Sequence, residues 1–94
     1  MTKYDVQYFI DKFEAIPEEK WCVGVYVSGN DERMCALGHC GQYAVRTPES
    51  RGLIDVLGSV TEVAEINDGK HPGYLQPTPK QRVLAALRDV REKA

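Results

Sequence analysis

Three helix-start signals, spread over a chain of 94 residues, most constrain what this sequence can fold into. Thr2, Thr47 and Thr78 each precede an apolar stripe at helical spacing, and a proline directly follows the second and the third. A threonine hydroxyl can accept a hydrogen bond from a free amide of the first turn, and proline fits the first helical position. The stripes are Val6, Phe9, Ile10, Phe13 and Ile16; then Leu53, Ile54, Leu57 and Val60; then Val83, Leu84, Leu87 and Val90. Three amphipathic helices are therefore predicted, the first ending at Pro17 and the second at Gly58.

Residues 21–27 predict a strand, because β-branched and aromatic residues alternate there with other residue types. Residues 28–31 have the composition of a turn. Two interpretations compete for the segment after this turn: a short return strand around 33–36, or a helix from Glu32 or Met34 to Val45, which we favour. A strand without a partner in its own chain would favour pairing between two copies, so a homodimer is among our predictions.

The second half of the chain completes the predicted architecture. Residues 60–66 fit either a short helix or a strand, and 67–73 are rich in turn formers, which predicts a loop. We expect one domain over residues 1–94, of the α+β class but mainly α, with four to five short helices packed with one small strand or β-hairpin. The predicted core consists of Phe9, Ile10, Phe13, Trp21, Val23, Val25, Leu37, Leu53, Ile54, Leu57, Val83, Leu84 and Leu87.

Charge and cysteine content narrow the class of protein. The net charge of −2 gives no electrostatic reason to expect nucleic acid as a partner. The last helix is locally basic, which we interpret as a solvated face; its basic residues are Lys80, Arg82, Arg88, Arg91 and Lys93. We expect no signal peptide and no membrane-spanning segment. Three cysteines, an odd number, indicate reduced thiols and a cytoplasmic location.

Cys35 is the residue that most suggests chemistry. At the start of the favoured helix, free amides and the helix dipole would lower the pKa of its thiol. His71 could act as a base, with Asn67 or Asp68 orienting its imidazole, as in a cysteine-dependent hydrolase or transferase. We favour the competing interpretation, in which Cys35 is a small buried hydrophobic residue, because no cysteine-protease signature surrounds it.

A metal site has less support than this catalytic hypothesis. Cys22, Cys35, His39, Cys40 and His71 could supply ligands. Zinc sites usually combine two closely spaced pairs of Cys or His, and the chain has no Cys-x-x-Cys and no His-x3-His. We predict neither a metal nor a cofactor.

Candidate binding residues concentrate between positions 67 and 77. Asn67 and Asp68 precede a glycine, so a structural role in a turn is favoured over ligand contact. His71 and Tyr74 lie on a loop that could contact a protein partner or a small ligand, or else pack back onto the domain. The candidate binding residues are Asn67, Asp68, His71, Tyr74 and His39.

Four short motifs follow one another along the chain. They are Trp21-x-x-Gly24, Cys35-Ala36-Leu37-Gly38, Asn67-Asp68 and a Thr78-led helix with Val83-Leu84. In this order they resemble a family of small uncharacterised bacterial and phage proteins, with the usual pattern Trp-x-x-Gly, Cys-x-Leu-Gly-Ala, Trp-Asn-Asp and Thr-x-x-Glu-Val-Leu. The chain departs from that pattern at His39, where the family has a small residue, and at Ile66, where it often has Trp. The resemblance implies an α-rich small domain and a special interest of Cys35, Asn67 and Asp68, but no activity.

The function predicted from the sequence is a small non-catalytic binding or regulatory protein of bacterial, phage or mobile-element type. The chain has no glycine-rich phosphate loop and no paired-carboxylate motif. A chain of this length also has little room for both a core and an enclosed substrate pocket. The alternative is a cysteine-dependent hydrolase or transferase, with Cys35 as nucleophile and His71 as base.

Overall fold

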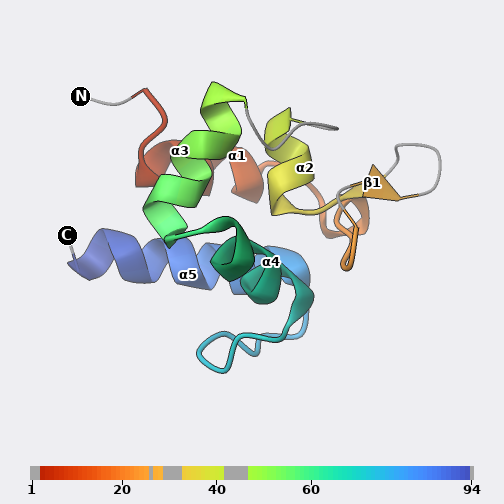
Figure 1. Cartoon of the computed structure of the whole chain (residues 1–94). Coiled ribbons are helices and arrows are strands. Elements are labelled where there is room, and N and C mark those ends of the chain that lie inside the picture. The colour runs from red at the N-terminus through yellow and green to blue at the C-terminus, as the bar shows by residue number, and fades with distance from the viewer. Residues whose placement is uncertain (1–2, 26, 29–32, 42–46, 94) are drawn as a thin grey trace.

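Helices make up most of the structure, a computed structural model that describes residues 3–25, 27–28, 33–41 and 47–93 (Figure 1). The elements are α1 (Val6–Glu14), the 3-10 helix η1 (Glu18–Lys20), β1 (Val27–Ser28), β2 (Arg33–Met34), α2 (Ala36–Gly41), α3 (Pro48–Leu57), α4 (Val60–Asp68) and α5 (Pro79–Lys93). The predicted fold class, mainly α with one small hairpin, is confirmed. No helix within these described ranges is both long and apolar enough to cross a membrane.

Two of the three predicted helix starts are confirmed. The Thr47 hydroxyl accepts a hydrogen bond from the Ser50 amide at 3.0 Å. The Thr78 hydroxyl accepts one from the Gln81 amide at 3.2 Å. The first helix begins later than Thr2, which lies outside the described residues: Asp5 caps α1 by accepting from the Tyr8 amide at 2.9 Å. A carboxylate at this position also favours the positive end of the helix dipole.

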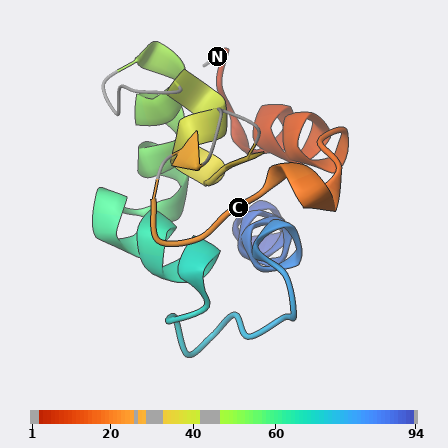
Figure 2. The ribbon, with the colours of Figure 1, turned by 90° about the vertical axis from the view of Figure 1, so that its right-hand side faces the viewer.

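The short helices are arranged around α5. Figure 2, which looks nearly along the axis of α5, shows α1 on one side of it and α4 on the other. α2 packs against α3 and α4 and closes the side away from α5. The buried apolar residues of the core are Phe9, Ile10, Phe13, Trp21, Cys35, Ala36, Leu37, Cys40, Leu53, Val63, Ile66, Val83, Leu84, Ala86 and Leu87. Ile54 and Leu57, expected in this core, are only partly buried against it.

The predicted strand over 21–27 is mostly wrong. Only Val27–Ser28 pairs as a strand, antiparallel to Arg33–Met34, and Trp21 adds an isolated parallel bridge to Met34. The Cys22 amide still donates to the Met34 carbonyl at 3.1 Å, but residues 23–25 bend away from the ladder, and Gly24 takes a left-handed φ of 80° there. Their valines therefore point outward: Val23 is 50% exposed and Val25 is 52% exposed, so neither belongs to the core as predicted.

The segment after residue 32 contains both of the competing elements, first a short strand and then a helix. Residues 33–34 form the return strand, and the helix begins only at Ala36. Residues 42–45 of the favoured helix lie outside the described residues. The ambiguous segment 60–66 is helical, and α4 continues through Asp68. Asn67 and Asp68 are thus the last residues of a helix, not of a loop as predicted, and Gly69 ends that helix in the left-handed conformation.

Candidate functional site

Asn67 joins three segments that are distant in the sequence. Its side chain lies in the last turn of α4 and is 1% exposed. The Oδ1 atom accepts a hydrogen bond from the Ala36 amide at 3.1 Å, which is a free donor at the start of α2. The Nδ2 group donates to the Cys22 carbonyl at 2.9 Å and to Asp68 Oδ1 at 3.0 Å. The predicted structural role of Asn67 is therefore present, but as a buried link between segments.

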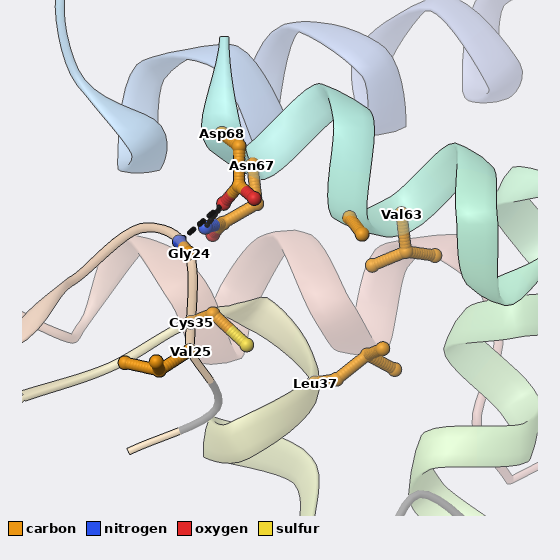
Figure 3. A pocket seen from close by; sticks show the side chains of 8 residues that line it. Gly24, Val25, Cys35, Leu37, Val63, Asn67 and Asp68 are labelled. Atoms are coloured by element: carbon orange, nitrogen blue, oxygen red, sulfur yellow. Dashed lines mark hydrogen bonds between the residues drawn. The ribbon is translucent and has the colours of Figure 1, made fainter. Parts of the chain in front are cut away.

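Asp68 lies next to this link and holds the 22–25 segment. Its Oδ1 atom accepts a hydrogen bond from the Gly24 amide at 3.0 Å (Figure 3). The same oxygen accepts from Asn67 Nδ2, so two donors share one carboxylate oxygen. The contact fixes the bend at Gly24 against the end of α4.

Arg82 supports the other side of the same turn. Its guanidinium donates to the carbonyls of Ile66 at 3.2 Å, Asn67 at 2.7 Å and Gln76 at 2.8 Å. Two of these bonds reach the last turn of α4, where the Ile66 carbonyl also accepts from the Gly69 amide, and the third reaches the loop that follows. Burial lowers the pKa of Arg82, and the charge of Asp68 opposes that shift. The sequence predicts Arg82 on a solvated basic face, and this prediction is wrong for Arg82. The residue is buried, because its guanidinium bonds backbone carbonyls at the end of α4.

A pocket of about 430 Å³ opens beside Asp68 (Figure 3). Residues of the 22–25 segment, of the start of α2 and of one face of α4 form its wall. They are Gly24, Val25, Cys35, Leu37, Val63, Ala64, Asn67 and Asp68. Most of this wall is apolar, and Asp68 brings a carboxylate to it.

Cys35 lies in the pocket wall, where burial opposes the predicted activation of its thiol. It is 8% exposed, and burial raises the pKa of its thiol. The Gly38 amide donates to its sulfur at 3.4 Å, and hydrogen bonds from the Gly38 and Leu37 backbone lower the pKa. The sequence predicted that amides at the start of this helix would lower the pKa of the thiol, and these two amides do so. Desolvation outweighs them, so the expected lowering of the pKa is wrong.

His71 has partners other than Cys35. Its Nε2 atom lies 3.2 Å from Glu62 Oε2, and its Nδ1 atom accepts a hydrogen bond from the Gly73 amide at 3.1 Å. Both imidazole nitrogens are thus engaged on the 71–74 loop and on α4. His71 is also not among the described residues that line the pocket. The structure does not bring the predicted base to the predicted nucleophile.

The 71–77 loop packs back onto the helices. The Tyr74 hydroxyl donates to Asp89 Oδ2 on α5 at 2.8 Å, and the Tyr74 ring lies 5.1 Å from the His71 ring. Burial, followed by the hydrogen bond to Asp89, raises the pKa of Tyr74. Of the two interpretations of this loop, the structure therefore favours packing onto the domain, although Leu75, 69% exposed, still faces solvent.

His39 and Cys40 lie within the interior side of α2. The His39 ring packs edge-on against Trp21, with centroids 4.8 Å apart, and burial lowers its pKa to about 4. Its Nε2 atom is buried without a hydrogen-bond partner among the described residues. Burial raises the pKa of Cys40 to about 12. Across the described part of the chain, no three His, Cys, Asp or Glu side chains converge as metal ligands would.

No sequence pattern indicates that Arg82 or the apolar pocket residues belong to a site. One signal could have found part of the site. Val63 and Asn67 are four residues apart, so in a helix they share one face, and an asparagine on an apolar face needs buried partners. Reading 60–68 as one helix would have placed Asn67 in the interior. The positions of its partners, 31 and 45 residues away, carry no local signal.

Comparison of the chain with known proteins finds no relative. No protein-family model, no curated protein and no solved structure matches this chain.

Proposed function

We propose that this protein is a non-catalytic binding protein that holds a small, largely apolar ligand in the pocket beside Asp68. The observation that supports the proposal is the pocket itself. Its volume of about 430 Å³ falls in the range of roughly 300–1,000 Å³ that is typical of small-molecule sites. Val25, Leu37, Val63 and Ala64 provide apolar contact, and buried hydrogen bonds through Asn67 hold the three wall segments together.

Cysteine chemistry is not part of the proposal. The Cys35 thiol is buried and its pKa is raised, which disfavours the thiolate. The expected base, His71, bonds Glu62 and Gly73 instead. Cys35 then serves as one polarizable part of the wall.

The proposal includes a cytoplasmic location and a bacterial, phage or mobile-element origin, as the sequence predicted. The free thiols of Cys22, Cys35 and Cys40 support a reducing compartment. It also includes a homodimer, supported by the exposed side chains of Val23 and Val25. Light scattering at two concentrations tests the dimer, and a monomeric mass at both would remove it from the proposal.

A titration with a simple apolar probe tests the binding function. We expect cyclohexanol to shift the amide resonances of Leu37, Val63 and Ala64 in a saturable way in ¹H–¹⁵N NMR spectra. Ala64→Trp should abolish these shifts, because the exposed Ala64 lies on the pocket wall and an indole there would fill the space.

Glu65→Trp is the matched control. Glu65 is the next residue of α4, is exposed and is not among the pocket residues. The control protein should bind cyclohexanol as the wild type does. Shifts that do not saturate, or that persist unchanged in Ala64→Trp, would contradict the proposed function.

A further inference from the structure

The polar groups of the pocket wall differ in how many of their hydrogen-bonding positions other residues already occupy. Asn67 has no free donor to offer a ligand, because its Nδ2 group donates to Cys22 and Asp68, and its Oδ1 atom already accepts from the Ala36 amide. The Gly24 amide is engaged by Asp68. Asp68 differs, because its two donors share Oδ1, and no described residue donates to Oδ2. The carboxylate is therefore the polar group through which the pocket can bind a ligand.

No cationic side chain among the described residues forms an ion pair with Asp68. The ion pairs among the described residues join Lys12 to Glu49, Arg88 to Glu14 and His71 to Glu62, and none includes Asp68. Arg82 acts on it only through space, because the guanidinium donates to three backbone carbonyls of 66–76. A carboxylate beside an apolar wall, without a bonded cation, is complementary to a positively charged donor.

From this arrangement we infer that the pocket selects small alkylammonium compounds, with the ammonium group on Asp68 and the alkyl chain against Val25, Leu37, Val63 and Ala64. The inference rests on the proposed function and names its ligand class. An ammonium group is a donor without an acceptor, so it matches a carboxylate that only accepts. A carboxylate ligand would be repelled at the same position, and a neutral alcohol would gain a weaker hydrogen bond.

Three probes of equal chain length test the inference at pH 7: hexylammonium, hexan-1-ol and hexanoate. We expect hexylammonium to bind about tenfold or more tightly than hexan-1-ol, because charge-assisted hydrogen bonds are stronger than neutral ones. Hexanoate should bind most weakly. The same amide resonances of Leu37, Val63 and Ala64 report all three titrations.

Asp68→Asn removes the charge and can still accept from the Gly24 amide. We expect it to lose the preference for hexylammonium and to keep the binding of hexan-1-ol. Glu65→Gln, with the same change of net charge on an exposed residue of α4, should keep the preference. Retention of the preference in Asp68→Asn would overturn the inference.

The wild-type titrations separate the two proposals even where a variant does not fold. Equal affinity for hexylammonium and hexan-1-ol would overturn the ligand class and leave the binding function in place. Tighter binding of hexanoate than of hexylammonium would have the same effect. Failure of all three probes to bind would overturn the proposed function as well.

Discussion

At the scale of the residue, Asn67 provides hydrogen bonds to two backbone groups that are distant in the sequence. It satisfies the Ala36 amide and the Cys22 carbonyl, which belong to two different backbone segments. An unsatisfied buried donor or acceptor costs more than the net gain of an ordinary hydrogen bond, because it loses its water without compensation. Replacing Asn67 would therefore leave two backbone groups unpaired at once.

We expect Asn67→Ala to lower the free energy of unfolding by roughly 2–4 kcal/mol, since each orphaned buried group costs about 1–3 kcal/mol. Urea denaturation followed by Trp21 fluorescence measures the change. Glu65→Ala, on the exposed side of the same helix, serves as control and should stay within about 0.5 kcal/mol of the wild type. If both substitutions cost the same, water must replace the amide, and the link described for Asn67 would be refuted.

The sequence predicted a structural role for Asn67 and a buried alternative for Cys35, but for local reasons only. Asn67 precedes Asp68 and a glycine, and such a group usually forms a turn. Its actual role depends on Cys22 and Ala36, and no sequence pattern indicates that these segments meet. The raised pKa of Cys35 likewise depends on how closely other elements cover it. Its position at a helix start was visible in the sequence, whereas its desolvation was not.

At the scale of the element, the end of α4 is fixed by a left-handed glycine. Gly69 has a φ of 79°, and its amide bonds the carbonyls of Glu65 and Ile66. A Cβ at this position would lie 3.2 Å from Cζ of Arg82. Gly24 has nearly the same φ, 80°, but a Cβ there would meet no atom within 4 Å. A side chain at Gly24 would therefore cause backbone strain alone, whereas one at Gly69 would cause backbone strain and steric crowding.

Gly24→Ala should cost about 1–2 kcal/mol of stability, the typical strain of a left-handed residue with a Cβ. Gly69→Ala should cost more than that, because its Cβ also displaces Arg82 from the carbonyls at the end of α4. Thermal unfolding of both variants under one condition measures the difference. Equal losses of stability would show that Arg82 moves aside at no cost.

Helix starts could be predicted from the sequence because their chemistry is local. Thr47 and Thr78 bond amides three residues ahead, and each stands directly before a proline. The strand over 21–27 could not be predicted in the same way. Its alternation is real, but Gly24 bends the chain to reach Asp68, 44 residues away. A long-range hydrogen bond therefore overrides a local pattern.

At the scale of the whole molecule, apolar burial around α5 holds the helices together. The polar contacts between α1 and α5, such as Arg88 with Glu14 at 3.2 Å, are exposed and contribute little to stability. A partly buried histidine lies at the edge of this core. His39 packs on Trp21, and burial lowers its pKa from an ordinary value of 6.5 to about 4; the Lys20 backbone opposes this shift, and the charge of Lys12 adds to it. The fold therefore favours neutral His39.

This preference makes the stability of the whole fold depend on pH. Below pH 6.5 the unfolded chain binds a proton at His39, whereas the folded chain binds it only near pH 4. The stabilisation is thus complete above pH 6.5 and is lost as the pH falls toward 4. Allowing for the partial exposure of the ring, we expect His39 to account for a loss of roughly 2 kcal/mol across this window.

Urea denaturation at half-unit pH steps measures this loss of stability. His39→Gln should lose less stability than the wild type between these values, while His71→Gln should keep the contribution of His39. Parallel curves for the wild type and His39→Gln would mean that His39 takes up its proton in the folded protein as readily as in the unfolded chain.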